Sequence, residues 1–442
     1  MSSVERKLGS VENIFHIIHE LGGMIDVNIA RIEGDIQPHI LQKALLLLQN
    51  RYPLLRVRII DLEDGAYFSS ENIQKIPLKV MTKTYENQWL EIAESELHQK
   101  FSQGFNPLCR ITLLKSSFRD GISEIIATFH YSIADGLSCM NFIDNLLIYY
   151  QKIVSQEEIS NPSSLAFPPP IEQNIDKNSV NYSQTEDTKN EDSSDSLSPK
   201  LILENDAKIN ERRTHIINRI IDSKTLLNLK EQSRNQKTTI HGALCAAMLL
   251  GTKTISNFEE PVNLSCSSNI NLRKYSQPEI DMNSFGCFVS SVENIYTLTK
   301  NINFWDLARN CKEQIELNKN QTINNLINGQ RFANFSKLTL EKMLEQNSTG
   351  RVKTMNISNR GKFNLAKNYG QLKIKEIYFT VGQHILGPCL WLGAVTFHDK
   401  LCLSFAHVTP LISSQTMNNF ADSVVSILEK VTIGESLSKG NG

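Results

Sequence analysis

One short segment, residues 124–137 (EIIATFHYSIADGL), constrains the fold more than any other part of the chain. Its first half is apolar and mostly β-favouring, which predicts a strand that ends at His130 and Tyr131. The Asp135-Gly136 pair is a turn signal, and apolar residues at helical spacing follow it. A strand that brings a histidine to such a turn can present a base, although on this pattern alone a structural histidine is the commoner outcome.

Strand and helix patterns alternate along the rest of the chain. Before residue 165, helical spacing is found at 10–21, 38–51 and 89–101, and strand patterns at 24–32, 55–60 and 110–114. After residue 210, helices are predicted at 240–250, 304–317 and 413–428, and strands at 215–221, 261–267, 353–357, 374–381, 392–397 and 401–405, with a turn at 358–361. This mixture predicts an α/β fold.

A change of composition predicts where the chain divides. Residues 172–199 are rich in Ser, Asn, Asp and Glu and nearly empty of large apolar side chains, so they cannot bury enough surface to order themselves. We therefore predict a flexible acidic crossover linker over 166–210, between a subdomain at 1–165 and a second at 211–435, with a disordered tail at 436–442. A tolerated loop expansion explains the segment more simply than a docking segment for a partner.

Charge and cysteine usage exclude several classes of function. A net charge of −1 over 442 residues gives no reason to expect nucleic acid as a partner. No apolar run approaches the roughly 20 residues that span a bilayer, and the first 22 residues lack the continuous apolar core of a signal peptide. None of the eight cysteines forms a C-x-x-C pair and no phosphate-cradling glycine loop is found. We expect a cytoplasmic protein that does not span a membrane, with reduced thiols, no metal and no resident cofactor.

The segment His130-Tyr131-Ser132-Ile133-Ala134-Asp135-Gly136 resembles the His-His-x-x-x-Asp-Gly signature of the condensation-domain superfamily. The resemblance is closest to the alcohol acetyltransferase and polyketide-associated acyltransferase branch. Further matching pieces follow the same order along nearly the whole chain, at residues 6–12, 52–56, 239–244, 271–273 and 358–361. The resemblance implies two chloramphenicol-acetyltransferase-like subdomains, each a mixed sheet with flanking helices, and an active-site tunnel between them.

The resemblance also implies an activity. An acyltransferase of this kind moves an acyl group from a CoA or carrier-protein thioester to an alcohol or amine, in lipid or in polyketide and peptide secondary metabolism. The acyl-CoA or phosphopantetheine-bound acyl group is then a substrate and not a cofactor, and an acyl or peptidyl carrier protein is an expected partner. Cyclisation of a tethered intermediate occurs in the superfamily too, but no residue here supports it.

Seven residues receive roles from the resemblance, by their position in the matching pieces. The expected catalytic residues are His130 and Tyr131. Asp135 is expected to pair with Arg273 of the second subdomain, and Gly136 to permit the tight turn before the helix. The expected substrate-binding residues are Ser358 and Asn359.

Tyr131 departs from the family pattern, since the second histidine of the signature is the catalytic base there. A phenol with a pKa of about 10 is deprotonated in about one part in a thousand at pH 7, so it donates a hydrogen bond readily but is a poor base. Three roles are therefore open. Tyr131 polarises the acceptor or the thioester carbonyl, or His130 takes over as the base in a reshaped loop, or the site binds an acyl thioester or carrier protein without turnover.

Overall fold

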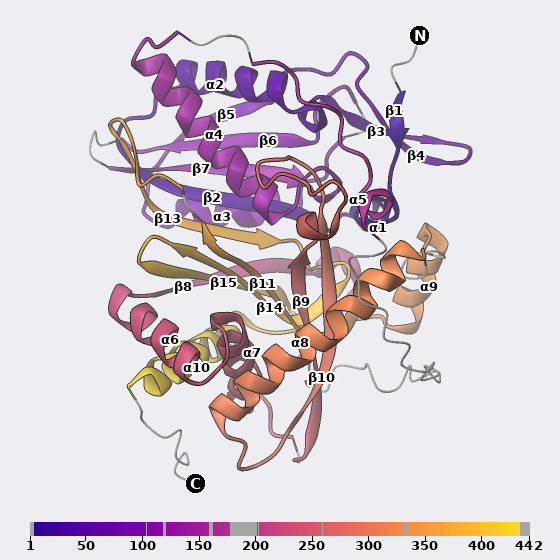
Figure 1. The fold of residues 1–442 in the computed structure, drawn as a ribbon, viewed down its shortest axis with the longest axis vertical. Helices are drawn as coiled ribbons and strands as arrows, with labels where there is room; N and C mark the ends of the chain where they lie inside the picture. The colour runs from indigo at the N-terminus through magenta and orange to yellow at the C-terminus, as the bar shows by residue number, and fades with distance from the viewer. Residues whose placement is uncertain are drawn as a thin grey trace.

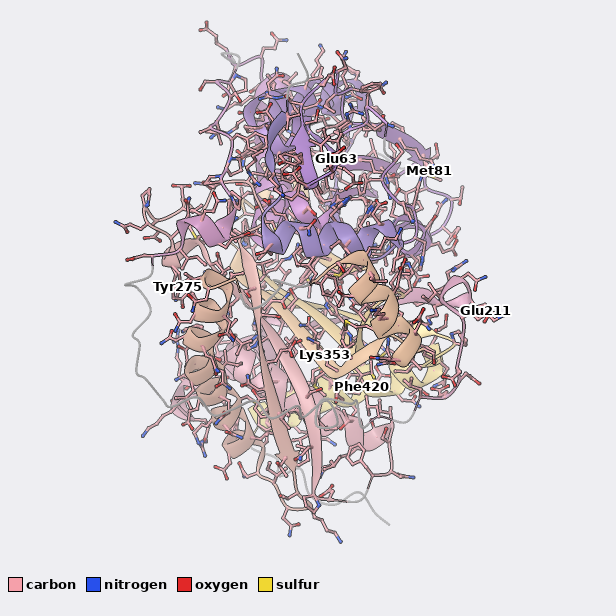
Figure 2. The ribbon with its side chains drawn as sticks, turned by 90° about the vertical axis from the view of Figure 1, so that its right-hand side faces the viewer. Glu63, Met81, Glu211, Tyr275, Lys353 and Phe420 are labelled. Carbon is pink, nitrogen blue, oxygen red and sulfur yellow. The ribbon has the colours of Figure 1, made fainter. Side chains whose placement is uncertain are left out.

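Two mixed sheets of six strands each form the two halves of the molecule, with helices packed around them (Figure 1). The computed structural model describes residues 4–102, 104–117, 121–158, 162–176, 201, 203–258, 260–329, 335–363 and 365–433. Seen a quarter turn away, Glu63 and Met81 lie on the first half, and Lys353 and Phe420 on the second (Figure 2). The predicted α/β class with two subdomains is confirmed.

The first sheet has the strand order β12-β13-β2-β7-β6-β5. Its strands are β2 (Ile25–Glu33), β5 (Leu78–Thr82), β6 (Cys109–Lys115), β7 (Ile122–His130), β12 (Asn368–Tyr369) and β13 (Leu372–Val381). Its helices are α1 (Ser10–Glu20), α2 (Pro38–Arg51), α3 (Gln88–Glu96) and α4 (Gly136–Val154), and a small sheet of β1 (Val4–Lys7), β4 (Gly65–Ser69) and β3 (Arg58–Leu62) lies beside it. Strand β7 is buried on both faces after its first residue, which explains its nearly continuous apolar sequence.

The second sheet has the order β10-β9-β11-β14-β15-β8. Its strands are β8 (Arg213–Ile221), β9 (Val262–Asn271), β10 (Val289–Leu298), β11 (Arg351–Phe363), β14 (Gly387–Phe397) and β15 (Lys400–Thr409). Its helices are α6 (Ser223–Asn235), α7 (Ile240–Gly251), α8 (Phe304–Ile327), α9 (Lys337–Gln346) and α10 (Ser414–Thr432). Every residue of α7 from Gly242 onward is buried, because α8 and α10 pack against it and cover it along with the sheet.

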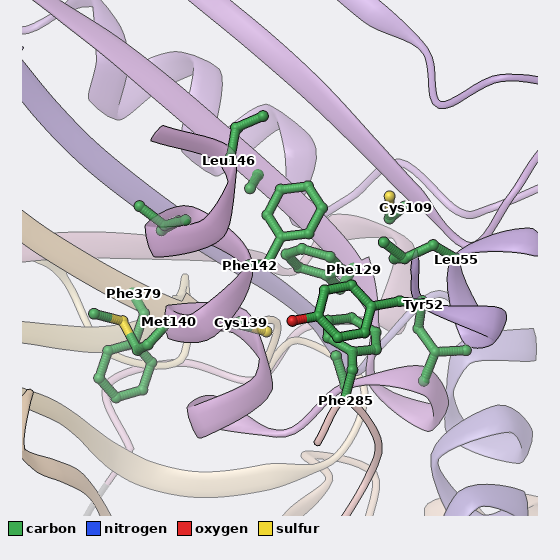
Figure 3. Close-up of a cluster of buried hydrophobic side chains, with 14 of the residues drawn as sticks. Tyr52, Leu55, Cys109, Phe129, Cys139, Met140, Phe142, Leu146, Phe285 and Phe379 are labelled. Carbon is green, nitrogen blue, oxygen red and sulfur yellow. The ribbon is translucent and has the colours of Figure 1, made fainter. Parts of the chain in front are cut away.

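Aromatic side chains join the two halves near the motif strand. Phe285 comes from the loop before β10, and its ring centroid lies 5.2 Å from that of Tyr52 and 6.1 Å from that of Phe129 on β7 (Figure 3). Phe142 of α4 meets Phe129 edge to face at 5.1 Å. Such pairs contribute about 0.5–1.5 kcal/mol each beyond the area that they bury. The core of the first subdomain therefore includes a side chain from the second.

Strand β13, with the short β12 before it, belongs to a different sheet from β11 and β14, which flank the two in sequence. It pairs antiparallel with β2, with Phe379 opposite Asn28, although β11 before it and β14 after it lie in the second sheet. The predicted division of the chain at residue 211 places 374–381 in the second subdomain, so this strand crosses that boundary. The crossing strand adds to the contact between the two halves, because its residues 377–381 are all buried.

Strand β11 runs through the segment for which the sequence predicts a turn. Residues 358–361 continue the strand, and the pairing with β14 shifts register between Asn359 and Lys362. Gly361 has φ +72°, a conformation that favours glycine. The glycine that suggests a turn in the sequence therefore allows the register shift inside the strand. The prediction of a turn here was wrong.

The ends of the predicted linker pack against the body of the protein. The short helix α5 (Ile171–Asn174) buries Ile171, and Ile175 forms an isolated β-bridge with Ser276 of the second subdomain. The sequence did not indicate this packing. Residues 177–200, which make up most of the acidic stretch, and the predicted tail at 436–442 lie outside the described residues. Among the helices that the structure describes, none is long and apolar enough to cross a bilayer.

Candidate active site

Tyr131 lies at the wall between two cavities. Strand β7 ends at His130, residues Tyr131–Ile133 form one 3-10 turn, and Asp135 caps α4 by accepting a bond from the Ser138 N–H at 2.8 Å. Apolar atoms make up most of the surface of both cavities, but the lining residues differ: those of the cavity of about 240 Å³, the apolar cavity, are mostly apolar, and those of the cavity of about 480 Å³, the polar cavity, are mostly polar or charged. Both are lined by Tyr131, Asn269 and Val289. The two cavities are separate ones with these three residues in common, and a continuous tunnel through them stays a prediction.

The two cavities differ in chemistry. The apolar cavity is lined by side chains of α1, β10, β14 and neighbouring segments, including Val11, Ile14, Phe15, Met24, Val381 and Trp391. The polar cavity is lined by the start of α4, the ends of β9 and β11 and the loop before β10, including Asn141, Asp144, Asn271, Asn283, Ser358 and Asn359. A group held in the second cavity would meet more amide and charged side chains than a group held in the first, which also has polar residues such as Asn356 and Gln383 in its wall.

The Tyr131 phenol stays protonated. Its side chain is 6% exposed, and its ring packs against Phe15 of α1 with centroids 4.4 Å apart. Burial raises the pKa of Tyr131 well above its usual value, and the nearby Asp26 carboxylate acts in the same direction. Tyr131 is therefore a hydrogen-bond donor at neutral pH and not a base.

His130 points away from both cavities, as expected for adjacent residues at a strand end. Its Nδ1 accepts a bond from the Ser132 N–H at 3.1 Å, so the proton of the neutral ring lies on Nε2. His19 and His16 of α1 lie against it, with ring centroids 4.2 Å and 5.9 Å away. Burial, followed by the charges of His19 and His16, lowers its pKa well below the usual value. The structure does not bring His130 to the cavities that Tyr131 lines.

The predicted pair between Asp135 and Arg273 is confirmed as a contact. Arg273 donates from Nη1 to Asp135 Oδ2 at 2.7 Å and from Nη2 to Oδ1 at 3.1 Å, and both side chains are buried. Nη2 of Arg273 also donates to the Ser138 hydroxyl at 2.9 Å, and Asp135 Oδ2 accepts from the Phe288 N–H at 3.0 Å. The pair therefore fastens the motif turn to the loop before β10 in the second subdomain.

Gly136 is needed for space and not for a turn. It does not adopt a left-handed φ, and a Cβ at this position would lie 2.5 Å from Nε of Arg360. The expectation that Gly136 permits a tight turn was therefore wrong, since the constraint comes from a side chain on β11 that passes over the start of α4.

Arg360 is a site residue to which the sequence assigned no role. Its Nη2 donates to Asp26 Oδ2 at 2.9 Å, its Nη1 bonds Asn28, and its guanidinium carbon lies 3.5 Å from the centroid of the Phe379 ring. Arg360 lines the polar cavity, and its charge opposes the rise in the pKa of Tyr131. The signal for it was its place in the Ser358–Gly361 piece, but nothing in the sequence indicated Asp26 as its partner.

The predicted substrate-binding residues lie on β11. Ser358 and Asn359 both line the polar cavity, and Asn359 Oδ1 accepts a bond from the Gly361 N–H at 2.8 Å. Their contact with substrate stays a prediction. Within the described ranges, no group of three or more His, Cys, Asp or Glu side chains has the geometry to hold a metal ion.

Comparisons with known proteins agree with this architecture. The family model for the condensation domain matches residues 27–437. The fold is similar to polyketide synthase associated protein 5 from Mycobacterium tuberculosis, with TM-score 0.68 and 16% identity over 98% of this chain and 99% of that one. It is also similar to the trichothecene 15-O-acetyltransferase TRI3 from Fusarium sporotrichioides, with TM-score 0.72 and 13% identity over 96% and 94% of the chains. A third similar structure is the epimerization domain from the third module of tyrocidine synthetase B, with TM-score 0.69 and 15% identity over 98% of both chains. No curated protein sequence matches the chain.

Proposed function

The chain belongs to the condensation-domain family, and from this premise we propose that it is an acyltransferase that moves an acyl group from a thioester to an alcohol or amine. One observation carries the proposal: Tyr131, at the position of the family's base, lies between an apolar cavity and a polar one. Two separate substrates can thus approach the same side chain. The acyltransferase and condensation domains among the similar structures support the same chemistry.

In this proposal Tyr131 acts as a hydrogen-bond donor. The acceptor oxygen or nitrogen attacks the thioester carbonyl, a C–O or C–N bond forms, and the C–S bond breaks. The acceptor's proton ends on the departing sulfur, so atoms and charge balance without a redox partner. Negative charge collects on the carbonyl oxygen during the attack, and a buried phenol that stays protonated is suited to stabilise it. The charge of Arg360 lies close enough to Tyr131 to add to this stabilisation.

The frame around Tyr131 supports catalysis by holding the donor in place. Asp135 and Arg273 fix the turn that follows it, and Phe15 packs against the phenol ring. A fixed donor needs no reorganisation when charge develops on the substrate. The donor molecule is acyl-CoA or an acyl carrier protein, and the reaction belongs to lipid, polyketide or peptide metabolism.

A second candidate function is binding of an acyl thioester or carrier protein without turnover. One observation favours it: no histidine is among the described residues that line either cavity, and the pKa of Tyr131 is raised and not lowered. A protein that only binds would keep the same frame.

A thiol-release assay distinguishes acyl transfer from binding without turnover. Wild type is mixed with a panel of acyl-CoAs and with a loaded carrier protein, each with simple alcohols and amines. We expect thiol release in wild type, a fall of about 10²- to 10³-fold in Tyr131→Phe as for other lost oxyanion donors, and no change in Tyr85→Phe, whose ring lies at the surface.

Equal rates in wild type and Tyr131→Phe would remove Tyr131 from the mechanism. Tight binding of an acyl-CoA or a loaded carrier with no release in any variant would establish the second candidate function instead.

A further inference from the structure

A third cavity, of about 950 Å³, lies between the subdomains and shares no lining residue with the two cavities at Tyr131. We call it the basic cavity. The first subdomain contributes Leu21, Gly22, His98 and Lys100, and the end of the predicted linker contributes residues 206–210. The second subdomain contributes residues 211–213, Leu344, Ser348, His384 and Ile385. Glu211, one of its residues, lies beside the boundary between the two halves in Figure 2.

The basic cavity carries more positive than negative charge. Its lining holds four cationic side chains and two carboxylates, which are Lys100, Lys208, Arg212, Arg213, Asp206 and Glu211. In the part of the chain that the structure describes, none of the four cations forms an ion pair with a carboxylate, and the side chains of Lys100, Arg212 and Arg213 donate to main-chain oxygens instead. Arg213 Nη1, for example, donates to the Asn210 carbonyl at 3.0 Å. Four positive and two negative side chains give the lining a net charge of +2.

Arg212 makes this arrangement costly. Arg212 is 1% exposed, its Nε and Nη2 donate to the Ala207 carbonyl at 3.1 and 3.0 Å, and Nη2 also donates to the Ser348 carbonyl. Its Nη1 has no hydrogen-bond partner among the described residues. Burial lowers the pKa of Arg212, and the charge of Asp206 opposes that shift only in part. A buried cation without a paired opposite charge costs several kcal/mol of solvation free energy. Carbonyl oxygens return only part of that cost, because they carry no net charge.

Burial and the same positive charge lower the pKa values of two neighbouring side chains, Arg351 and His384. Arg351, also buried, donates to the Pro388 carbonyl at 2.7 Å and to the Gln383 carbonyl at 2.6 Å. Burial, together with the nearby charge of Arg212, lowers the pKa of Arg351 to about 10. Burial also lowers the pKa of His384 to about 3, helped by the charges of His98 and Arg213. A bound anion would attract these positive charges and so oppose the lowering of the two pKa values.

We propose that the basic cavity binds an organic phosphate through the exposed cations Lys208, Arg213 and Lys100, with the charge of the buried Arg212 behind them. The guanidinium group of the exposed Arg213 suits phosphate oxygens, and several cations in one wall match a multiply charged group. The volume lies in the range of small-molecule sites and exceeds what an inorganic ion needs. The phosphate can come from a nucleotide of the CoA type or from a separate phosphorylated metabolite, and the inference does not depend on acyl transfer.

Calorimetric titration of the full chain with adenosine 3′,5′-bisphosphate, inorganic phosphate and adenosine tests the proposal. None of these probes holds a thioester, so activity plays no part. We expect one molecule of bisphosphate bound per chain, with an affinity that falls as salt is raised, and no binding of adenosine. Lys208→Glu and Arg213→Glu should each raise Kd by about tenfold or more. Both side chains are exposed, and Lys430→Glu, an exposed lysine of α10, is the matched control.

The relative affinities of the probes show whether the cavity binds phosphate and from which source. Tighter binding of the bisphosphate than of inorganic phosphate supports the proposal with a nucleotide as the source, and equal binding supports it with the phosphate group alone as the determinant. Absence of binding by both phosphate probes to wild type would overturn it. Unchanged affinity in the two charge-reversed variants, with melting temperatures equal to wild type, would also overturn it.

Discussion

Replacing Arg273 with alanine tests the link between the motif turn and the second subdomain. Arg273 holds Asp135 with two hydrogen bonds, donates to the Ser138 hydroxyl and to the Ser284 carbonyl at 3.1 Å, and lies 4.7 Å from the Phe288 ring centroid. The substitution removes all of these contacts at once. It leaves the Asp135 carboxylate buried, with the backbone N–H groups of Ser138 and Phe288 as its remaining donors.

The expected cost follows from the burial of the pair. Removing one partner of a buried ion pair costs about 3–5 kcal/mol, because the other charge is left without compensation. Since Asp135 keeps two backbone donors, we expect a loss of about 3 kcal/mol in the free energy of unfolding, measured by urea denaturation with far-UV circular dichroism. Arg219→Ala breaks the exposed pair with Asp422 and is the matched control, with an expected loss of at most about 1 kcal/mol.

A double-mutant cycle separates the pair from the other contacts of Arg273. If the pair is the main term, adding Asp135→Asn to Arg273→Ala costs less than it does in wild type, because the unpaired charge is gone. The reasoning would be refuted if Arg273→Ala lost no more stability than Arg219→Ala, or if the two substitutions at the pair were additive.

Two further predictions concern the site and its supporting helix. Gly136→Ala places a methyl group 2.5 Å from Arg360 Nε, so we expect a loss of about 1–3 kcal/mol in urea unfolding; a variant as stable as wild type would contradict the requirement for space. Burial, followed by the charges of His16, Lys100 and Arg110, lowers the pKa of His19 to about 3. In the unfolded chain His19 binds a proton near pH 6.5, but in the folded chain it stays neutral until about pH 3. The contribution of His19 to the free energy of unfolding is therefore fully present above pH 6.5 and is lost as the pH falls toward 3. Between pH 7 and pH 5 it amounts to about 2 kcal/mol, and His19→Gln should reduce the pH dependence of the unfolding free energy by that amount; an unchanged dependence would show that His19 titrates normally.

The motif itself was predictable because its signals are local. The strand and the helix at residues 124–137 follow from periodicity and appear as β7 and α4. The Asp-Gly pair marks the start of α4, with Asp135 as its N-cap, and the 3-10 turn lies before it at Tyr131–Ile133. The partnership of Asp135 with Arg273 came from the family resemblance, since no local pattern joins two residues 138 positions apart.

The remaining features depend on contacts that sequence periodicity does not encode. The sequence pattern predicts a strand at 374–381 but not which sheet it joins, and this is why the crossing of β13 into the first sheet was missed. The same holds for Arg360 and Asp26, which lie on different strands 334 positions apart. Gly136 shows the limit of reasoning from glycine alone, because the need for space arises from a side chain on a distant strand.

The measurement that tests the central claim most directly is the rate of thiol release by Tyr131→His, followed against pH beside wild type. If position 131 is where the acyl group is transferred, a histidine there restores the family's base, and we predict a faster rate than wild type with an inflection that wild type lacks. A histidine variant that melts like wild type and binds the same acyl donor, yet releases no thiol faster than wild type at any pH, would contradict the account.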